Sequence, residues 1–252
     1  MIKQLIEAFP LTERSVLDPS TLRISEFYYD TIQGEGISVG CPAVFLRLQG
    51  CILNCSFCDT QAVWKEGNPY TYDELLTMME EVHVIKKLQE EYHLVITGGS
   101  PLMQQEHLLA FISRMMRKYY FRPYIEIENE CVILPHSLMI YYVSQWNNSP
   151  KLTNSGVRKE ARYKPKVISA MASLENSWFK FVISSKEDWK EIENEFLQPE
   201  LISKHQVILM PMGETPEEVV KHRELTVNLA IDNGVRYCSR EHIMIWGKKT
   251  GI

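Results

Sequence analysis

Three cysteines stand close together in the stretch Cys51-Ile52-Leu53-Asn54-Cys55-Ser56-Phe57-Cys58-Asp59-Thr60. Their spacing is C-x3-C-x2-C, and the whole chain of 252 residues holds six cysteines. Iron–sulfur clusters are held by cysteine thiolates, and a cubane cluster normally takes four of them. A loop that gives only three leaves one iron free to bind a substrate or a cofactor. The spacing is too short for a helix to supply all three ligands, so we expect a loop that follows a strand.

Two other interpretations of the three cysteines compete at this point. A structural zinc site closes with four ligands and usually draws them from two paired clusters. Cys41 could be the fourth ligand, but the sequence contains no second C-x2-C or H-x3-H cluster. The spacing could also be a coincidence among reduced cysteines, since a motif match is a hypothesis until its structural context is known.

Composition sets the broad class of the protein. Apolar residues make up 45% of the chain, which is enough for a sizeable core, and the length fits one α/β domain of the barrel or doubly wound type. The net charge of −5 gives no electrostatic case for a nucleic-acid partner. The first ten residues do not form a secretory signal, and no apolar run approaches the ~20 residues of a membrane helix. Clustered cysteines without a disulfide framework favour the cytoplasm.

Residues 43–49 form the first strong strand that the sequence predicts. The run is nearly all apolar, as expected for a strand that is buried on both faces. Arg47 interrupts it, and a buried arginine needs either a carboxylate of the protein or an anionic ligand as its partner. The strand ends at Gly50 and leads directly into Cys51, and reactive loops after strands are typical of barrels and open sheets.

Two glycine-containing loops follow other predicted strands. Gln33-Gly34-Glu35-Gly36 comes after residues 27–32, and its glycines let the backbone approach a ligand while Glu35 points at it. Gly98-Gly99-Ser100-Pro101 comes after residues 94–97 and exposes backbone groups that can hold a small charged ligand. Taken alone, the first fragment is better explained as a plain surface turn, and a tight turn explains the second fragment equally well.

Strand 124–128 alternates apolar and acidic residues, a period of two with the acids on one face. We expect Glu128, at the strand end, to reach a site and Glu126 to lie on a solvated face. The helix that begins at the capping box Thr71-Tyr72-Asp73-Glu74 should run for about four turns. We predict further helices over 105–118, 167–174 and from 216 to near Gly234, and strands over 138–143, 178–183 and 207–211. A last short strand in the tail should carry His242 and Trp246.

These segments together resemble the radical S-adenosylmethionine enzymes and, within them, the 7-carboxy-7-deazaguanine synthases. The superfamily match rests on the three cysteines, with Phe57 before the last, and on Thr97-Gly98-Gly99-Ser100-Pro101. The narrower match rests on six segments that run in family order. They are residues 31–36, 45–51 and 58–60, the turn Ser149-Pro150-Lys151, the strand end Met210-Pro211, and the tail 240–247.

The resemblance implies a fold and a reaction. The fold is a shortened, partly open TIM-like (β/α) barrel of the α/β class, over residues 25–252, with residues 1–24 as an extension that begins with a short helix over 1–9. The reaction is the conversion of 6-carboxy-5,6,7,8-tetrahydropterin to 7-carboxy-7-deazaguanine with loss of ammonia, a lyase step toward queuosine-type guanines. The cofactors are a [4Fe-4S] cluster, S-adenosylmethionine and Mg2+.

The resemblance also implies roles for individual residues. Cluster ligands are Cys51, Cys55 and Cys58, and Thr60 holds the magnesium ion. The S-adenosylmethionine site comprises Phe57, Cys58, Asp59, Gly99, Ser149, Pro150, Lys151, Met210, Pro211, Met212 and Gly213. Pterin contacts come from Ile32, Gln33, Gly34, Arg47, Thr97 and the terminal carboxylate of Ile252, and the catalytic group is Arg47, Glu35 and Thr97. A homodimer and an external electron donor such as flavodoxin complete the expected partners.

The sequence departs from the family in two places near the cofactor. The glycine pair is usually followed by Glu and here by Ser100, and the usual Glu-Thr-Asn-Gly turn is here Glu128-Asn129-Glu130-Cys131. A different enzyme remains open: small radical enzymes that make a glycyl radical on a partner protein share the three-cysteine loop. Such activases would need neither the 33–36 loop, nor Arg47, nor a magnesium site at Thr60.

Overall fold

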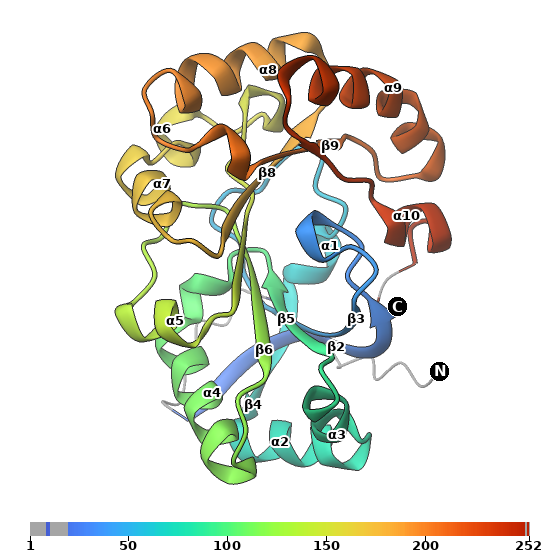
Figure 1. Ribbon diagram of the computed structural model, residues 1–252. Helices are drawn as coiled ribbons and strands as arrows, with labels where there is room; N and C mark the ends of the chain where they lie inside the picture. Colours follow the sequence, from blue (N-terminus) through green and yellow to red (C-terminus); the bar gives the residue numbers. More distant parts are fainter. Residues whose placement is uncertain (1–8, 11–19, 250, 252) are drawn as a thin grey trace.

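The computed structural model describes residues 9–10, 20–249 and 251. Within them, ten strands form one sheet in the order β1-β4-β2-β3-β5-β6-β7-β8-β9-β10 (Figure 1). The run β3-β5-β6-β7-β8-β9-β10 is parallel throughout. Strand β2 pairs antiparallel with β3 on one side and with β4 on the other, and β1 pairs antiparallel with β4. The strands are β1 Phe9–Pro10, β2 Thr21–Ile32, β3 Pro42–Leu48, β4 Glu66–Thr71, β5 His93–Gly98, β6 Tyr124–Asn129, β7 Gln145–Asn148, β8 Ser177–Ile183, β9 Val207–Pro211 and β10 Arg236–Tyr237.

Helices connect successive parallel strands, as a parallel sheet requires. Figure 1 shows α4, α5, α7, α8 and α9 as a layer on the outer side of the sheet. The helices are α1 Gln61–Trp64, α2 Tyr72–Glu81, α3 Val84–Gln89, α4 Gln105–Tyr119, α5 Ser137–Tyr142, α6 Lys159–Arg162, α7 Pro165–Ala172, α8 Lys186–Ile192, α9 Pro216–Asn233 and α10 Glu241–Trp246. Shorter helical turns are η1 Gly36–Ser38, η2 Pro101–Gln104, η3 Thr153–Ser155, η4 Glu193–Leu197 and η5 Lys204–Gln206.

The predicted fold class is confirmed. Strands alternate with helices, and the two outermost strands, β1 and β10, do not pair with one another in the described part of the chain, so the barrel stays open. Strand β2 begins at Thr21 and therefore includes the end of the predicted N-terminal extension. The helix predicted over residues 1–9 lies outside the described residues except for Phe9, which belongs to β1.

The core lies between the sheet and the outer helices. Leu94, Val95 and Ile96 of β5 are fully buried, as the near-continuous apolar run of a central parallel strand requires. Helix α4 buries four apolar side chains at positions three or four residues apart: Leu108, Phe111, Ile112 and Met115. Each contributes roughly 2 kcal/mol by leaving water, so this one face fixes the helix against the sheet.

The predicted single helix after the capping box is two helices. The box itself forms as expected, because Thr71 accepts from the backbone of Glu74 and the Glu74 carboxylate accepts from the backbone of Thr71. Helix α2 ends at Glu81, and His83 then adopts a left-handed conformation with φ of 59° before α3. Acidic Glu80 and Glu81 at the C-terminal end of α2 oppose the helix dipole, which favours termination there.

Two strand predictions are wrong. Residues 138–143 lie in α5, whose first turn is capped by His136: Nδ1 accepts from the backbone N–H of Leu138 at 3.2 Å. A short apolar run can form either a helix or a strand, and here it forms a helix. The true strand β7 follows it, in a polar segment whose Asn and Gln residues are unfavourable in strands. In the tail, His242 and Trp246 lie in helix α10 rather than in a strand.

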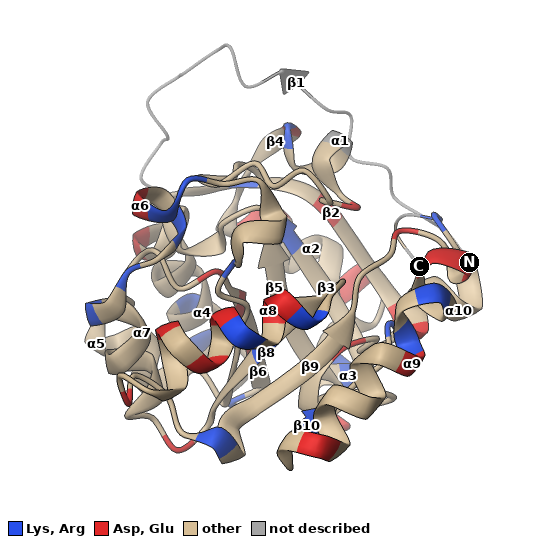
Figure 2. Cartoon of the chain, turned by 90° about the horizontal axis from the view of Figure 1, so that it is seen from above, with Lys and Arg blue, Asp and Glu red and all other residues tan. Residues whose placement is uncertain are grey.

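The outer surface carries mixed charge. Figure 2 shows basic and acidic residues interspersed along α4, α8 and α9, with no single-sign stripe there. Among the described residues, none of the helices combines the length and the apolar character that a bilayer crossing needs.

Candidate active site

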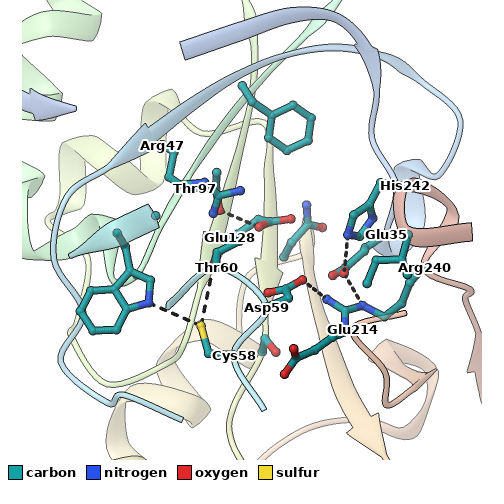
Figure 3. Close-up of a pocket in the computed structure, with 18 of the residues that line it drawn as sticks. Glu35, Arg47, Cys58, Asp59, Thr60, Thr97, Glu128, Glu214, Arg240 and His242 are labelled. Atoms are coloured by element: carbon teal, nitrogen blue, oxygen red, sulfur yellow. Dashed lines mark hydrogen bonds and ion pairs between the residues drawn. The ribbon is translucent and has the colours of Figure 1, made fainter. Parts of the chain in front are cut away.

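A cavity of about 240 Å3 lies at the carboxyl ends of the parallel strands (Figure 3). Its walls come from the ends of β3, β5, β6, β7 and β9, from the cysteine loop, from residues 32–35 and from the tail. Ligands of open α/β sheets bind at this edge, because the loops after the strands converge there. The cavity is therefore the candidate active site.

The predicted cysteine loop follows β3 and lies on one wall of the cavity. Hydrogen bonds fix it at two points: the backbone N–H of Ser100 donates to Gly50 at 2.8 Å, and that of Ser56 donates to Ser155 at 2.9 Å. All six cysteines are free thiols. The indole of Trp64, a buried side chain, donates to the Cys58 sulfur at 3.4 Å.

The three loop cysteines suit an iron–sulfur cluster, because each thiolate of such a cluster binds its own iron. Among the described residues, no group of three or more His, Cys, Asp or Glu side chains is gathered where one metal ion could bind. Burial raises the pKa of the Cys55 thiol, and Lys151 partly offsets this by favouring the thiolate that a metal requires.

Glycine at position 99 is required by the approach of two chain segments. A Cβ atom there would lie 2.3 Å from the Cβ of Cys51 and 2.3 Å from the carbonyl oxygen of Gly50. No side chain larger than hydrogen fits at position 99, so the backbone after β5 packs directly against the start of the cysteine loop. The glycine pair thus sets the position of the first cysteine. From the sequence alone, a plain turn was an equally good explanation of this pair.

Arg47 has a carboxylate of the protein as its partner. Its Nε donates to Glu26 at 2.9 Å, and Nη2 donates to the hydroxyl of Tyr28 at 3.5 Å. Burial opposes the arginine's charge, but Tyr28 and Glu26 outweigh it and raise the pKa of Arg47. The guanidinium still lines the cavity beside Thr97, as Figure 3 shows, so it can also face a ligand.

The prediction for Glu126 is wrong. This side chain is fully buried instead of solvated. Its carboxylate accepts from Asn147 at 2.6 Å, from Gln145 at 3.2 Å and from Gln33 at 3.4 Å, and it also contacts His93. The expected role of Glu128 fits better, since it lines the cavity and accepts from the Thr97 hydroxyl at 2.7 Å.

Glu35 is the centre of an ion-pair network. It contacts Lys180, Arg240 at 2.9 Å and His242 at 3.7 Å, and Arg240 also donates to Asp59 at 2.6 Å (Figure 3). Burial raises the pKa of Glu35, but Lys180 and Arg240 outweigh burial and hold it well below its usual range. Burial lowers the pKa of His242 and favours the neutral ring.

Most predicted site residues line the cavity. They are Ile32, Gln33, Gly34, Glu35, Arg47, Cys51, Cys55, Phe57, Cys58, Asp59, Thr60, Thr97, Gly99, Ser149, Lys151 and Met210. Met212 and Gly213 line a neighbouring pocket, which also touches Phe57. Pro150 and Pro211 are buried and line neither pocket, and Ile252 lies outside the described residues.

Several residues at the site were not predicted from the sequence. Glu26 and Trp64 could not be found by spacing, because their partners lie on other elements. The sequence did contain a signal for the other two residues. Lys180 is a cation inside an otherwise apolar strand, and Arg240 is a basic residue in the tail segment that the family resemblance covers. Glu130 was noted only as part of an unusual turn.

Three comparisons bear on the site. A family model described as a 4Fe-4S single cluster domain matches residues 32–127. The 7-carboxy-7-deazaguanine synthase of Pyrobaculum aerophilum is 34% identical over 91% of this chain and 97% of its own length. The synthase of Rhodopirellula baltica is 31% identical over 92% and 89%. The crystal structure of QueE from Escherichia coli superposes with a TM-score of 0.65 at 20% identity, covering 88% of this chain and 95% of that one.

Proposed function

This chain belongs to the 7-carboxy-7-deazaguanine synthases, and we propose that it converts 6-carboxy-5,6,7,8-tetrahydropterin to 7-carboxy-7-deazaguanine with release of ammonia. It is a radical S-adenosylmethionine enzyme of the carbon–nitrogen lyase type. One observation carries the proposal: a single cavity combines the three-cysteine loop with Arg47 and the Gly34-Glu35 backbone. That combination fits neither a glycyl-radical activase nor a zinc module.

Cys51, Cys55 and Cys58 would hold the [4Fe-4S] cluster. When bound, the reduced cluster and S-adenosylmethionine supply a deoxyadenosyl radical that removes a hydrogen atom from the substrate. The protein's part is to orient both molecules and to exclude water. Phe57, Met210 and the Ser149-Pro150-Lys151 turn would hold the cofactor, with Lys151 as the cation for its carboxylate. Its Nζ already donates to Ser149 at 2.9 Å, which fixes the ammonium group.

Arg47 and Thr97 would hold the pterin. The Glu26 carboxylate orients the guanidinium, whose remaining N–H groups can bind the substrate carboxylate in a site of low dielectric. Glu128 accepts from Thr97 and so leaves the hydroxyl oxygen free to accept from a substrate N–H. Ile32, Gln33 and Gly34 would supply the other pterin contacts, with the Gln33 amide held by Glu126.

Glu35 acts in this proposal as a positioning residue. Its carboxylate is paired with the cations Lys180 and Arg240 and also contacts His242, and these contacts join the 33–36 loop to β8 and to the tail. Arg240 extends the connection to Asp59 beside the last cysteine. Arg240 donates to Asp59 and to the carbonyl oxygen of Gly213. These contacts would hold the part of the cavity proposed to bind the cofactor at a fixed position relative to the part proposed to bind the substrate.

Thr60 would bind the magnesium ion. It lines the cavity, and its hydroxyl lies 3.7 Å from the Cys58 sulfur. One hydroxyl is a weak ligand, so substrate oxygens and water would complete the octahedron that magnesium prefers.

The expected partners of the protein follow from the same resemblance to the family. We propose a cytoplasmic homodimer, which takes electrons from an external donor such as flavodoxin. Six free thiols fit a reducing compartment. The mixed charge of the outer helices supports a partner set without nucleic acid (Figure 2).

The test is anaerobic reconstitution with iron and sulfide. EPR spectra of the reduced protein are recorded with and without S-adenosylmethionine, and the carboxytetrahydropterin and Mg2+ are then added. We expect a cluster signal that the cofactor perturbs, and a deazaguanine identified by ultraviolet spectrum and mass. Cofactor cleavage without product would indicate another radical enzyme, and stoichiometric zinc without a cluster would overturn the proposal.

A further inference from the structure

Glu130 stands out among the carboxylates of the cavity. It follows β6 directly, its side chain is 5% exposed, and it lines the cavity beside the cysteine loop. Neither of its carboxylate oxygens accepts a hydrogen bond of ordinary geometry within the described part of the chain. A buried carboxylate without partners is unfavourable, and such a group at a functional cavity calls for a ligand.

The other carboxylates that line the cavity all have partners. Arg47 pairs with Glu26, Arg240 with Glu35 and Asp59, Thr97 with Glu128, and Lys248 with Glu214. Glu130 is thus the one cavity carboxylate, among those described, that is left to bind a donor from outside the protein.

Ser100 does not fill the position that the family gives to Glu. It is 1% exposed and is not part of the cavity lining. Its hydroxyl accepts from the backbone N–H of Ile52 at 3.1 Å and donates to the Cys51 sulfur at 3.8 Å. Ser100 therefore supports the cysteine loop, and no carboxylate follows the glycine pair.

A cation accompanies Glu130. Lys151 lines the same cavity as Glu130 and Cys55, and its charge favours the ionised form of both. Burial raises the pKa of Glu130, and the charge of Lys151 partly offsets this effect. One carboxylate and one ammonium beside a cluster loop match the amino and carboxylate groups of an amino acid.

We propose that Glu130 accepts a hydrogen bond from the amino group of the methionine part of S-adenosylmethionine, with Lys151 facing the carboxylate of the same group. Glu130, at the end of β6, thereby supplies the carboxylate that the loop after β5 lacks. The inference rests on the proposed function, because it assumes that S-adenosylmethionine is the ligand beside the cysteine loop.

The test measures binding to the anaerobic holoenzyme with its cluster oxidised, so that no turnover occurs. Equilibrium dialysis gives the Kd of S-adenosylmethionine and of methylthioadenosine, which lacks the amino acid part. Glu130→Gln keeps the shape and removes the charge. We expect it to raise the Kd of S-adenosylmethionine about 10-fold to 100-fold, the range for a hydrogen bond to a charged group, and to leave methylthioadenosine within about twofold.

Other outcomes overturn the inference. Equal weakening of both ligands would mean that Glu130 only shapes the cavity, and no change for either would mean that it does not touch the cofactor. If Glu130→Gln loads less iron than the wild type, Glu130→Asp replaces it. That shorter carboxylate should also weaken S-adenosylmethionine selectively, and unchanged affinity would refute the assignment. Wild-type holoenzyme that fails to bind S-adenosylmethionine would instead refute the proposed function.

Discussion

Arg47 pairs with a carboxylate of the protein and is also proposed to bind the substrate, and a substitution can test the second role. Its Nε is fixed by Glu26, and the side chain lines the cavity. Arg47→Ala should raise the KM for the pterin about 10-fold to 100-fold, because a charge-assisted contact to the substrate carboxylate is lost. Cofactor cleavage without substrate should change little. Steady-state kinetics and the uncoupled cleavage assay measure both quantities.

The control for this experiment is Tyr28→Phe. Tyr28 contacts the same guanidinium through its hydroxyl at 3.5 Å, so its loss disturbs the arginine's surroundings without removing the charge. We expect a change in KM of less than about threefold, in line with a weak neutral contact. An equal loss of both activities in Arg47→Ala would mean that the arginine is structural.

Thr60 can be tested independently of the cluster. Thr60→Ala should reduce the stimulation by Mg2+ several-fold while iron and sulfide contents stay at the wild-type level, since the proposed magnesium site would lose the hydroxyl that binds the ion. The measurement is product formation against Mg2+ concentration. Thr60→Ser, which keeps the hydroxyl, serves as the matched control, and an unchanged Mg2+ response in Thr60→Ala would refute the ligand assignment.

Glu35 gives a pH-dependent contribution to stability. The folded protein holds its pKa well below the ordinary 4.5, because Lys180 and Arg240 outweigh the opposing effect of burial. The contribution is therefore complete above about pH 4.5 and is lost as pH falls below it. Glu35→Gln should lower the free energy of unfolding by about 3 kcal/mol at pH 7, and the difference should shrink in acid.

Urea unfolding of both proteins between about pH 3.5 and 7 measures this difference. Glu66→Gln, at an exposed position of β4, is the control and should change stability by less than about 0.5 kcal/mol. A Glu35→Gln difference that stays constant into acid would show that the ion pairs do not carry the effect.

At the level of single residues, the sequence predicted which side chains belong to the site better than it predicted which residues surround each side chain. The cysteines, Arg47 and Glu128 could be chosen because residue type and position at a strand end both pointed to the cavity. Glu126 was misplaced because alternation along one strand cannot reveal that Gln33, Gln145 and Asn147 meet it from other elements.

Among the elements, the contact between β5 and the cysteine loop is the most restrictive. Gly99→Ala would place a Cβ 2.3 Å from Cys51 Cβ and from the Gly50 carbonyl, and neither can rotate away. We expect the loop to shift and the iron content after reconstitution to fall several-fold, with strand content by circular dichroism unchanged. Overpacking of this kind destabilises by about 1–3 kcal/mol.

Gly40→Ala is the control for glycine replacement itself. Its φ of +87° disfavours a side chain, but no atom lies within 4 Å of the added Cβ. It should cost about 1 kcal/mol of stability without affecting iron content. Wild-type iron content in Gly99→Ala would mean that the loop is held by other contacts.

Element boundaries were predictable where local signals agreed with burial. The capping box before α2 and the apolar face of α4 are signals of this kind. Strand β7 was missed because its residues are polar and are satisfied by distant partners, as when Asn148 donates to Ser177 at 2.6 Å. The apolar run beside it was taken as the strand, although it packs as α5.

For the whole molecule, the proposed homodimer makes a direct prediction. Light scattering after size-exclusion chromatography should give about twice the chain mass of 29.4 kDa. Dilution should leave the mass unchanged until the concentration approaches the dimer Kd. A mass of one chain at all concentrations would contradict the dimer without affecting the assignment of the reaction.

The alternation of predicted strands and helices was enough to predict the fold class. It could not predict that residues of the tail pair with residues of the cavity. Arg240 joins Glu35 and Asp59 across sequence separations of 205 and 181 residues. No local pattern encodes such a pair, because only the curvature of the sheet brings the tail over the strand ends.

The long separation between Asp59 and Arg240 has a consequence for the order of events on the ribosome. At the usual rate of synthesis of about 5–20 residues per second, the 181 residues that follow Asp59 up to and including Arg240 take roughly 10 to 40 s to make. Throughout that interval the nascent cysteine loop exists without its final restraint. Delivery of iron and sulfide can therefore precede the locking of the loop, so that maturation of the enzyme becomes a question of timing as much as of affinity.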